Sequence, residues 1–183
     1  MMIIIFTGLS GVGKTTLANI VKEELIIIGF PTEVLDGDIF RKNISNDLGF
    51  SKEDRIIHLK RLAFIANILH RNNIITIIAA INPYENIRKT LFADNLLIKT
   101  VWITCDLKTL IDRDKKGLYK RALLPDNDPN KIHNFSGISD VYDVPQSPDL
   151  IIDTGKEDIS ASKNKILEFL LETISQNEAK LQP

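Results

Sequence analysis

The sequence predicts an α/β domain in which a five-stranded parallel sheet lies between two layers of helices. Short apolar runs rich in Ile and Val alternate along the chain with segments of helical periodicity. The apolar runs are continuous, which is typical of strands covered on both faces and therefore of a parallel sheet. The length of 183 residues fits one domain, 1–183, with a substantial core, and no linker divides it.

The elements follow one another in a regular order. The predicted strands are Met2–Phe6, Thr32–Leu35, Ile74–Ala79, Lys99–Thr104 and Leu150–Ile152. The predicted helices are Lys14–Ile28, Ser51–Asn72, Pro83–Asp94, Leu107–Asp112 and Asp158–Gln176. Gly29 is a typical residue to close the first helix, and Ser51 with Asp54 is typical of an N-terminal cap of the second. We expect a frayed tail over 177–183.

The most informative motif is GLSGVGKT, Gly8 to Thr15, which follows the first strand and opens the first helix. This spacing predicts a loop whose backbone N–H groups and following helix bind nucleotide phosphates. Lys14 would reach the β- and γ-phosphates of ATP, and the Thr15 hydroxyl would bind Mg²⁺. The predicted phosphate-binding residues are Gly8, Ser10, Gly11, Val12, Gly13, Lys14, Thr15 and Thr16. The alternative is a glycine-rich turn that fits the spacing by chance.

Composition excludes several classes of function. The net charge of −1 gives no basic excess for nucleic acid or an anionic membrane. The longest apolar stretches, such as Ile74 to Ile81, are too short to span a bilayer, and the first strand lacks the pattern of a signal peptide. The single cysteine, Cys105, forms no internal disulfide and is interpreted as a small hydrophobic residue. These features fit a cytoplasmic protein.

A pair of carboxylates follows the second strand in the segment LDGDIFR. Asp36 and Asp38 would lie at the carboxyl edge of the sheet, where open α/β sheets bind their ligands. A carboxylate there could accept a proton from an attacking hydroxyl or hold water on Mg²⁺. Arg41 is placed for an anionic group on the acceptor. The alternative is an ordinary strand-to-helix turn with a capping Asp.

The sequence predicts a lid over residues 113–137. Five basic side chains crowd Asp112 to Arg121, and Leu124 to Gly137 is polar without apolar periodicity. Such a segment could close cations over a transferring phosphate and exclude water. The alternative is a solvated, charged helix end. Two isolated aromatics, Phe50 and Phe135, are either plates for a nucleotide base or anchors in the core.

Taken in order, these motifs resemble the adenylylsulfate kinase family of P-loop kinases. The resemblance rests on GLSGVGKTTLA, LDGD with Arg41, DLGF, INPY, RDKKGLYK, NFSGISDVYD and IIDT, and it spans Met2 to Thr154. It implies a P-loop NTPase-type α/β/α sandwich with a lid. It also implies transfer of the ATP γ-phosphate to the 3′-hydroxyl of adenosine 5′-phosphosulfate (APS), with Mg²⁺ and a small-molecule nucleotide acceptor. A homodimer is a further possible partner.

The resemblance implies roles residue by residue. Lys14, Asp38 and Asp36 would be catalytic, with Asp38 orienting or deprotonating the 3′-hydroxyl. Arg113 and Thr154 would join the ATP site. The implied acceptor residues are Asp38, Arg41, Phe50, Arg55, His58, Asn82, Lys116, Gly117, Leu118 and Phe135. Of these, the two arginines would hold the anionic 5′ group, and the two phenylalanines would sandwich the base.

Several positions depart from the family pattern, and most lie on the acceptor side. Ile39 follows Asp38 in place of an asparagine, His58 also stands at an asparagine position, and a basic residue is missing before Asp47. Asn82 replaces a serine sometimes proposed to carry phosphate, which excludes a phosphoserine there. The lid is longer around Pro125 to Asn130. The acceptor could therefore differ, with cytidine diphosphoramidate as one alternative, and a nucleotide-binding protein without catalysis is a second.

Overall fold

The computed structural model of the chain describes residues 1–91 and 97–181, and its framework is a five-stranded parallel sheet in the order β2-β3-β1-β4-β5. The strands are β1 (Ile3–Thr7), β2 (Thr32–Asp36), β3 (Ile75–Ala79), β4 (Ile98–Thr104) and β5 (Leu150–Asp153). Each predicted strand is confirmed to within one residue at either end. The central strand β1 places the phosphate loop at the middle of the carboxyl edge.

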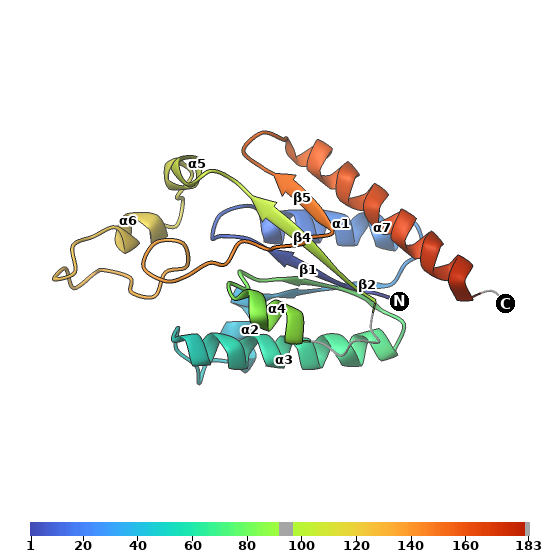
Figure 1. Cartoon of the computed structure of the whole chain (residues 1–183), viewed down its shortest axis with the longest axis horizontal. Helices are drawn as coiled ribbons and strands as arrows, with labels where there is room; N and C mark the ends of the chain where they lie inside the picture. The colour runs from blue at the N-terminus through green and yellow to red at the C-terminus, as the bar shows by residue number, and fades with distance from the viewer. Residues whose placement is uncertain (92–96, 182–183) are drawn as a thin grey trace.

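Helices cover both faces of the sheet, which gives the predicted three layers (Figure 1). The helices are α1 (Lys14–Ile27), α2 (Gly37–Ile44), α3 (Lys52–Arg71), α4 (Glu85–Thr90), α5 (Leu107–Asp112), α6 (Leu118–Ala122) and α7 (Ile159–Leu181). α1 and α7 lie on one face, and α2, α3 and α4 lie on the other.

The core has one cluster on each side of the sheet. Ile4 and Phe6 of β1 pack with Val21 of α1 and Leu170 of α7. Ile3, which points to the opposite face, packs in the second cluster with residues of α3. All five residues of β1 are buried, so burial on both faces explains why this run is apolar without alternation.

The helix predictions need four corrections. Both α2 and α6 were missed, because each is too short to show helical periodicity. α4 begins at Glu85 and ends at Thr90, inside the predicted Pro83–Asp94, and the end of that prediction lies outside the described residues. The tail prediction was wrong for 177–181, where α7 continues, since Glu, Ala, Lys and Leu in that stretch favour helix.

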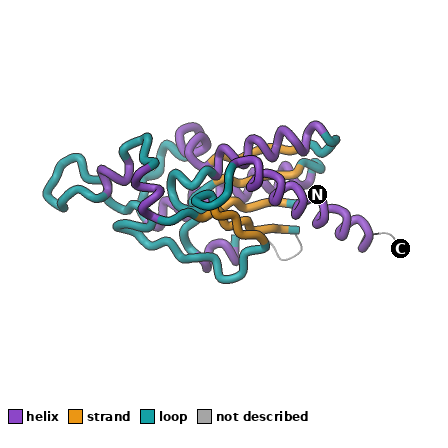
Figure 2. The backbone as a smooth tube through the Cα atoms, turned by 90° about the horizontal axis from the view of Figure 1, so that it is seen from above, coloured by secondary structure: helices purple, strands orange, loops and turns teal. Residues whose placement is uncertain are grey.

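The lid segment projects from the carboxyl edge of the sheet. α6 and the polar loop after it extend beyond the body of the molecule (Figures 1 and 2). The loop has internal ties: Lys131 forms an ion pair with Asp126 at 2.7 Å, and Arg121 donates to the Asn130 carbonyl at 3.1 Å. The predicted lid therefore contains one short helix and a loop held by its own polar contacts. Its closure stays a prediction.

Candidate functional site

The phosphate loop has the backbone that its glycines permit. Gly8 lies so close to β4 that a Cβ atom there would come 2.1 Å from the Ile103 carbonyl oxygen. Gly13 has a φ of 95°, in the left-handed region, and is the N-cap of α1. Because the N-cap is a glycine, it has no side chain to cap this helix end. The first amides of α1 are therefore left for a ligand, as a phosphate site requires.

Lys14 lies under this loop with its ammonium bound by backbone. Its Nζ donates to the carbonyls of Gly8 at 2.9 Å and Leu9 at 2.8 Å. Burial lowers the pKa of Lys14 to about 8, although the carboxylates of Asp38 and Asp36 act to raise it. An anionic ligand in the loop would favour the charged ammonium and draw it away from the carbonyls.

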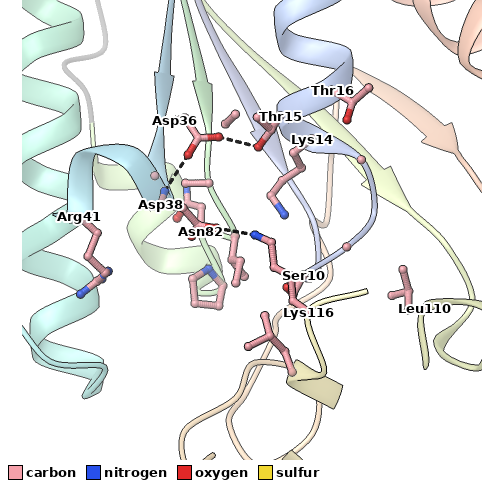
Figure 3. A pocket seen from close by; sticks show the side chains of 18 of the residues that line it. Ser10, Lys14, Thr15, Thr16, Asp36, Asp38, Arg41, Asn82, Leu110 and Lys116 are labelled. Atoms are coloured by element: carbon pink, nitrogen blue, oxygen red, sulfur yellow. Dashed lines mark hydrogen bonds and ion pairs between the residues drawn. The ribbon is translucent and has the colours of Figure 1, made fainter. Parts of the chain in front are cut away.

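Asp36, the last residue of β2, is linked to the phosphate loop by a side-chain hydrogen bond. One of its oxygens accepts the Thr15 hydroxyl at 2.5 Å, and the other accepts the N–H groups of Asp38 and Ile39 at 2.9 and 3.0 Å (Figure 3). The capping alternative is thus correct for Asp36, and the same carboxylate also reaches the site. The capped turn begins α2, the helix that this alternative implied and that the predicted helices did not include.

Asp38 differs from Asp36 because its carboxylate is exposed within the pocket. It forms a long ion pair with Lys116 of the lid, at 3.6 Å, between two exposed side chains. Such a pair contributes little to stability, at most about 1 kcal/mol. Asp38 is therefore free to meet a ligand, whereas Asp36 is committed to Thr15 and the cap.

Two arginines define the far end of the pocket from the phosphate loop. The guanidinium groups of Arg41 and Arg55 lie 4.8 and 5.6 Å from the centre of the Phe50 ring. Arg41 donates to the Gly49 carbonyl at 2.6 Å, and Arg55 donates to the Asn134 carbonyl. Burial and the neighbouring Arg55 charge lower the pKa of Arg41. Two cations this close favour an anion between them.

His58, on α3, is buried in the wall of the first pocket. Its Nε2 faces the Gly37 carbonyl at 3.1 Å and its Nδ1 faces the Ser45 hydroxyl at 2.9 Å. A carbonyl only accepts, so we assign the proton to Nε2. Burial, followed by the charge of Arg41, lowers the pKa of His58 to about 4. The imidazole is neutral and holds both ends of α2.

His58 should make folding stability depend on pH. Its pKa falls from 6.5 when unfolded to about 4 when folded, so the unfolded chain binds the extra proton. Its contribution is present above pH 6.5 and is lost as the pH falls toward 4. We expect urea unfolding to show a smaller loss of stability over that range in His58→Asn than in the parent. Equal pH slopes for the two proteins would contradict this assignment.

Two adjoining pockets contain most of the predicted site. The first, about 640 Å³, is lined by Ser10, Gly11, Gly13, Lys14, Thr15, Thr16, Asp36, Asp38, Arg41, Phe50, Arg55, His58, Asn82, Arg113, Lys116 and Leu118 among others. The second, about 610 Å³, is lined by Val12 and Thr154 and shares Gly11, Gly13, Thr16 and Arg113 with the first. The Thr154 hydroxyl donates to the Val12 carbonyl at 3.0 Å, which fixes its place beside the loop.

Three predicted residues lie outside both linings: Gly8, Gly117 and Phe135. Phe135 is buried edge-on against Tyr119, with ring centres 5.0 Å apart, so its anchoring role is present here. Phe50 lines the first pocket and Phe135 does not, and the sandwich of a base between them stays a prediction. The resemblance also implies that the segment Lys116–Tyr119 forms part of the lid on the ATP side. Tyr119 of this segment lines the first pocket, and its hydroxyl donates to the Ser10 carbonyl at 2.8 Å.

The site offers oxygen ligands but no dense metal cluster. Among residues 1–91 and 97–181, no group of three or more His, Cys, Asp and Glu side chains could hold a metal ion. Thr15 and Asp36 bring a hydroxyl and a carboxylate to one point, which fits a Mg²⁺ that takes its other ligands from phosphates and water. Over the same residues, no helix is long and apolar enough to cross a membrane.

Comparison with known proteins decides the family. Residues 1–153 match the model of the family described as adenylylsulphate kinase. The chain belongs to the adenylylsulphate kinase family. It is 43% identical over 167 residues to the adenylyl-sulfate kinase of Halothermothrix orenii, covering 91% of this chain and 88% of that protein.

Two further relatives extend the adenylylsulphate kinase match. A probable bifunctional SAT/APS kinase 2 from Sorangium cellulosum is 44% identical over 91% of this chain, which spans only 28% of that longer protein. The APS kinase CysC of Mycobacterium tuberculosis, solved in complex with AMPPNP and APS, superposes with a TM-score of 0.85. That match has 32% identity and covers 92% of this chain and 96% of the other. The predicted family and fold are confirmed.

Proposed function

We propose that this chain transfers the γ-phosphate of ATP to the 3′-hydroxyl of adenosine 5′-phosphosulfate. Membership of the adenylylsulphate kinase family makes it a phosphotransferase with an alcohol acceptor. The observation that carries the assignment is one pocket with a phosphate loop at one end and two arginines on an aromatic ring at the other. An exposed carboxylate, Asp38, stands between them.

The phosphate-loop half of the site suits ATP. The second pocket, beside Thr154, would receive the adenine, and Arg113, which lines both pockets, would lie along the phosphates. Thr15 and Asp36 would hold Mg²⁺, and the bound ion would neutralise charge on the β- and γ-phosphates. Lys14 would exchange two carbonyl contacts for phosphate oxygens.

The acceptor half suits a nucleotide with an anionic 5′ group. Arg41 and Arg55 would bind that group, and the exposed face of Phe50 would receive the base. Asp38 would then accept a hydrogen bond from the 3′-hydroxyl and take its proton as the oxygen attacks phosphorus. The bond between the γ-phosphorus and the oxygen that bridges it to the β-phosphate breaks, and ADP leaves. Asn82 has no hydroxyl to carry phosphate, so the transfer is direct.

A panel of acceptors tests the proposal. ADP release, measured with a coupled assay, should rise strongly on addition of adenosine 5′-phosphosulfate and little on addition of AMP or cytidine diphosphoramidate. Stronger stimulation by the cytidine compound would favour the alternative acceptor. No stimulation by any acceptor, despite ATP binding, would favour the non-catalytic alternative. A homodimer and a cytoplasmic location stay predictions from the sequence.

A further inference from the structure

Asn82, after β3, has a buried side chain with no partner. It is 1% exposed and lines the first pocket. Neither its Nδ2 nor its Oδ1 makes a hydrogen bond to any described residue of the chain. A buried amide without partners costs about 1–3 kcal/mol, so such groups are rare unless a ligand completes them. The same pocket wall contains His58, whose two ring nitrogens are both satisfied.

Hydrogen bonds hold the backbone around Asn82 in place. Asn82 has a φ of 44°, in the left-handed region. Its carbonyl accepts Arg88 Nη1 at 2.5 Å and the Thr7 hydroxyl at 3.3 Å. Arg88 also donates to the Asp143 carbonyl and to Glu85, which ties three segments together. The backbone that carries this side chain is therefore held in place beside the pocket that Asn82 lines.

The position of Asn82 in the fold indicates which group of a bound ligand it would contact. Thr7, which contacts its backbone, is the residue before Gly8 and the phosphate loop. β3 lies between β1 and β2, so Asn82 lies between that loop and the turn that carries Asp38. Asn82 and Asp38 line the same pocket, and Figure 3 shows both side chains in it, with Arg41 farther out on α2. This is where a γ-phosphate and an acceptor hydroxyl would meet.

We infer that Asn82 Nδ2 donates a hydrogen bond to a non-bridging oxygen of the phosphoryl group during its transfer. The inference rests on the proposed function. The phosphoryl oxygens are acceptors only, so they match the N–H groups of the amide. Oδ1 needs a donor, and the ammonium of Lys116, which already approaches Asp38, has protons to offer. A donor held in place before the reaction stabilises charge in the transition state without reorganisation.

Asn82→Gly tests the role of the amide, because glycine accepts the left-handed backbone and removes only the side chain. We expect kcat to fall about 100-fold while the KM values for both substrates change little, since the contact serves the group in transfer. Asn73→Gly is the matched control: Asn73 also has a positive φ, 59°, but is exposed and lines neither pocket. It should keep the parent kinetics.

Binding and stability measurements separate the outcomes. Calorimetry should show the same affinity for a non-hydrolysable ATP analogue in Asn82→Gly and the parent, and thermal unfolding should show both folded. Asn82→Asp, which loses the N–H donors and adds charge beside phosphate, should lose more kcat than the glycine variant. An unchanged kcat in Asn82→Gly, or a change confined to the acceptor KM, would overturn the inference. If the parent itself shows no acceptor-stimulated turnover, the proposed function fails instead.

Discussion

Replacing Lys14 by alanine should reduce acceptor-stimulated ADP release about 1,000-fold or more. The ammonium is the only side-chain cation that the phosphate loop itself supplies, and it lies within the loop at 2.9 and 2.8 Å from the carbonyls of Gly8 and Leu9. Alanine leaves these carbonyls in place and removes the charge that would stabilise the β- and γ-phosphates. Steady-state kinetics with saturating acceptor measure the effect.

Lys22→Ala is the matched control for this variant. Lys22 lies on the same helix, pairs with Glu33 at 2.7 Å and lines neither pocket. Loss of this surface pair should cost at most about 1 kcal/mol of stability and leave turnover unchanged. Turnover by Lys14→Ala near that of the parent would show that the loop does not act on the phosphates as described.

The sheet was predictable because burial on both faces makes each strand a continuous apolar run. β1 is the clearest case, since all five of its residues are buried and the glycine motif follows it directly. Short helices are harder to predict, because they contain too few residues to show a helical period. α2 begins because Asp36 caps it, and a capping Asp is indistinguishable in sequence from an Asp that serves a ligand. In this chain the same carboxylate does both.

The site was predictable where chemistry is local and less so where it depends on distant contacts. Gly8 to Thr15 form a site by their own spacing. The burial of His58 depends on Ser45 and Gly37, and the edge-on packing of Phe135 on Tyr119 depends on the fold of the lid. No periodicity in one segment reports such partners. The missing partners of the Asn82 amide are likewise visible only in three dimensions.

Asp38→Asn should lower kcat about 100- to 10,000-fold, the range expected for loss of a proton acceptor, while ATP affinity stays close to that of the parent. The carboxylate is exposed, and its one ion pair among the described residues is the long one with Lys116 at 3.6 Å, so the amide fits without disturbing the fold. It keeps a hydrogen-bond acceptor for the 3′-hydroxyl but cannot take its proton. Single-turnover kinetics and calorimetric titration of an ATP analogue give the two readouts.

Asp36→Asn provides the contrast that makes this test specific. Asparagine also caps helices, so α2 should still begin at the same place, and thermal unfolding can verify this. The variant loses the carboxylate that accepts the Thr15 hydroxyl at 2.5 Å, and its main defect should be weaker binding of MgATP. If Asp38→Asn instead lost ATP affinity and kept kcat, Asp38 would belong to the metal and ATP side. The two neighbouring carboxylates would then have the reverse of the roles that their contacts indicate.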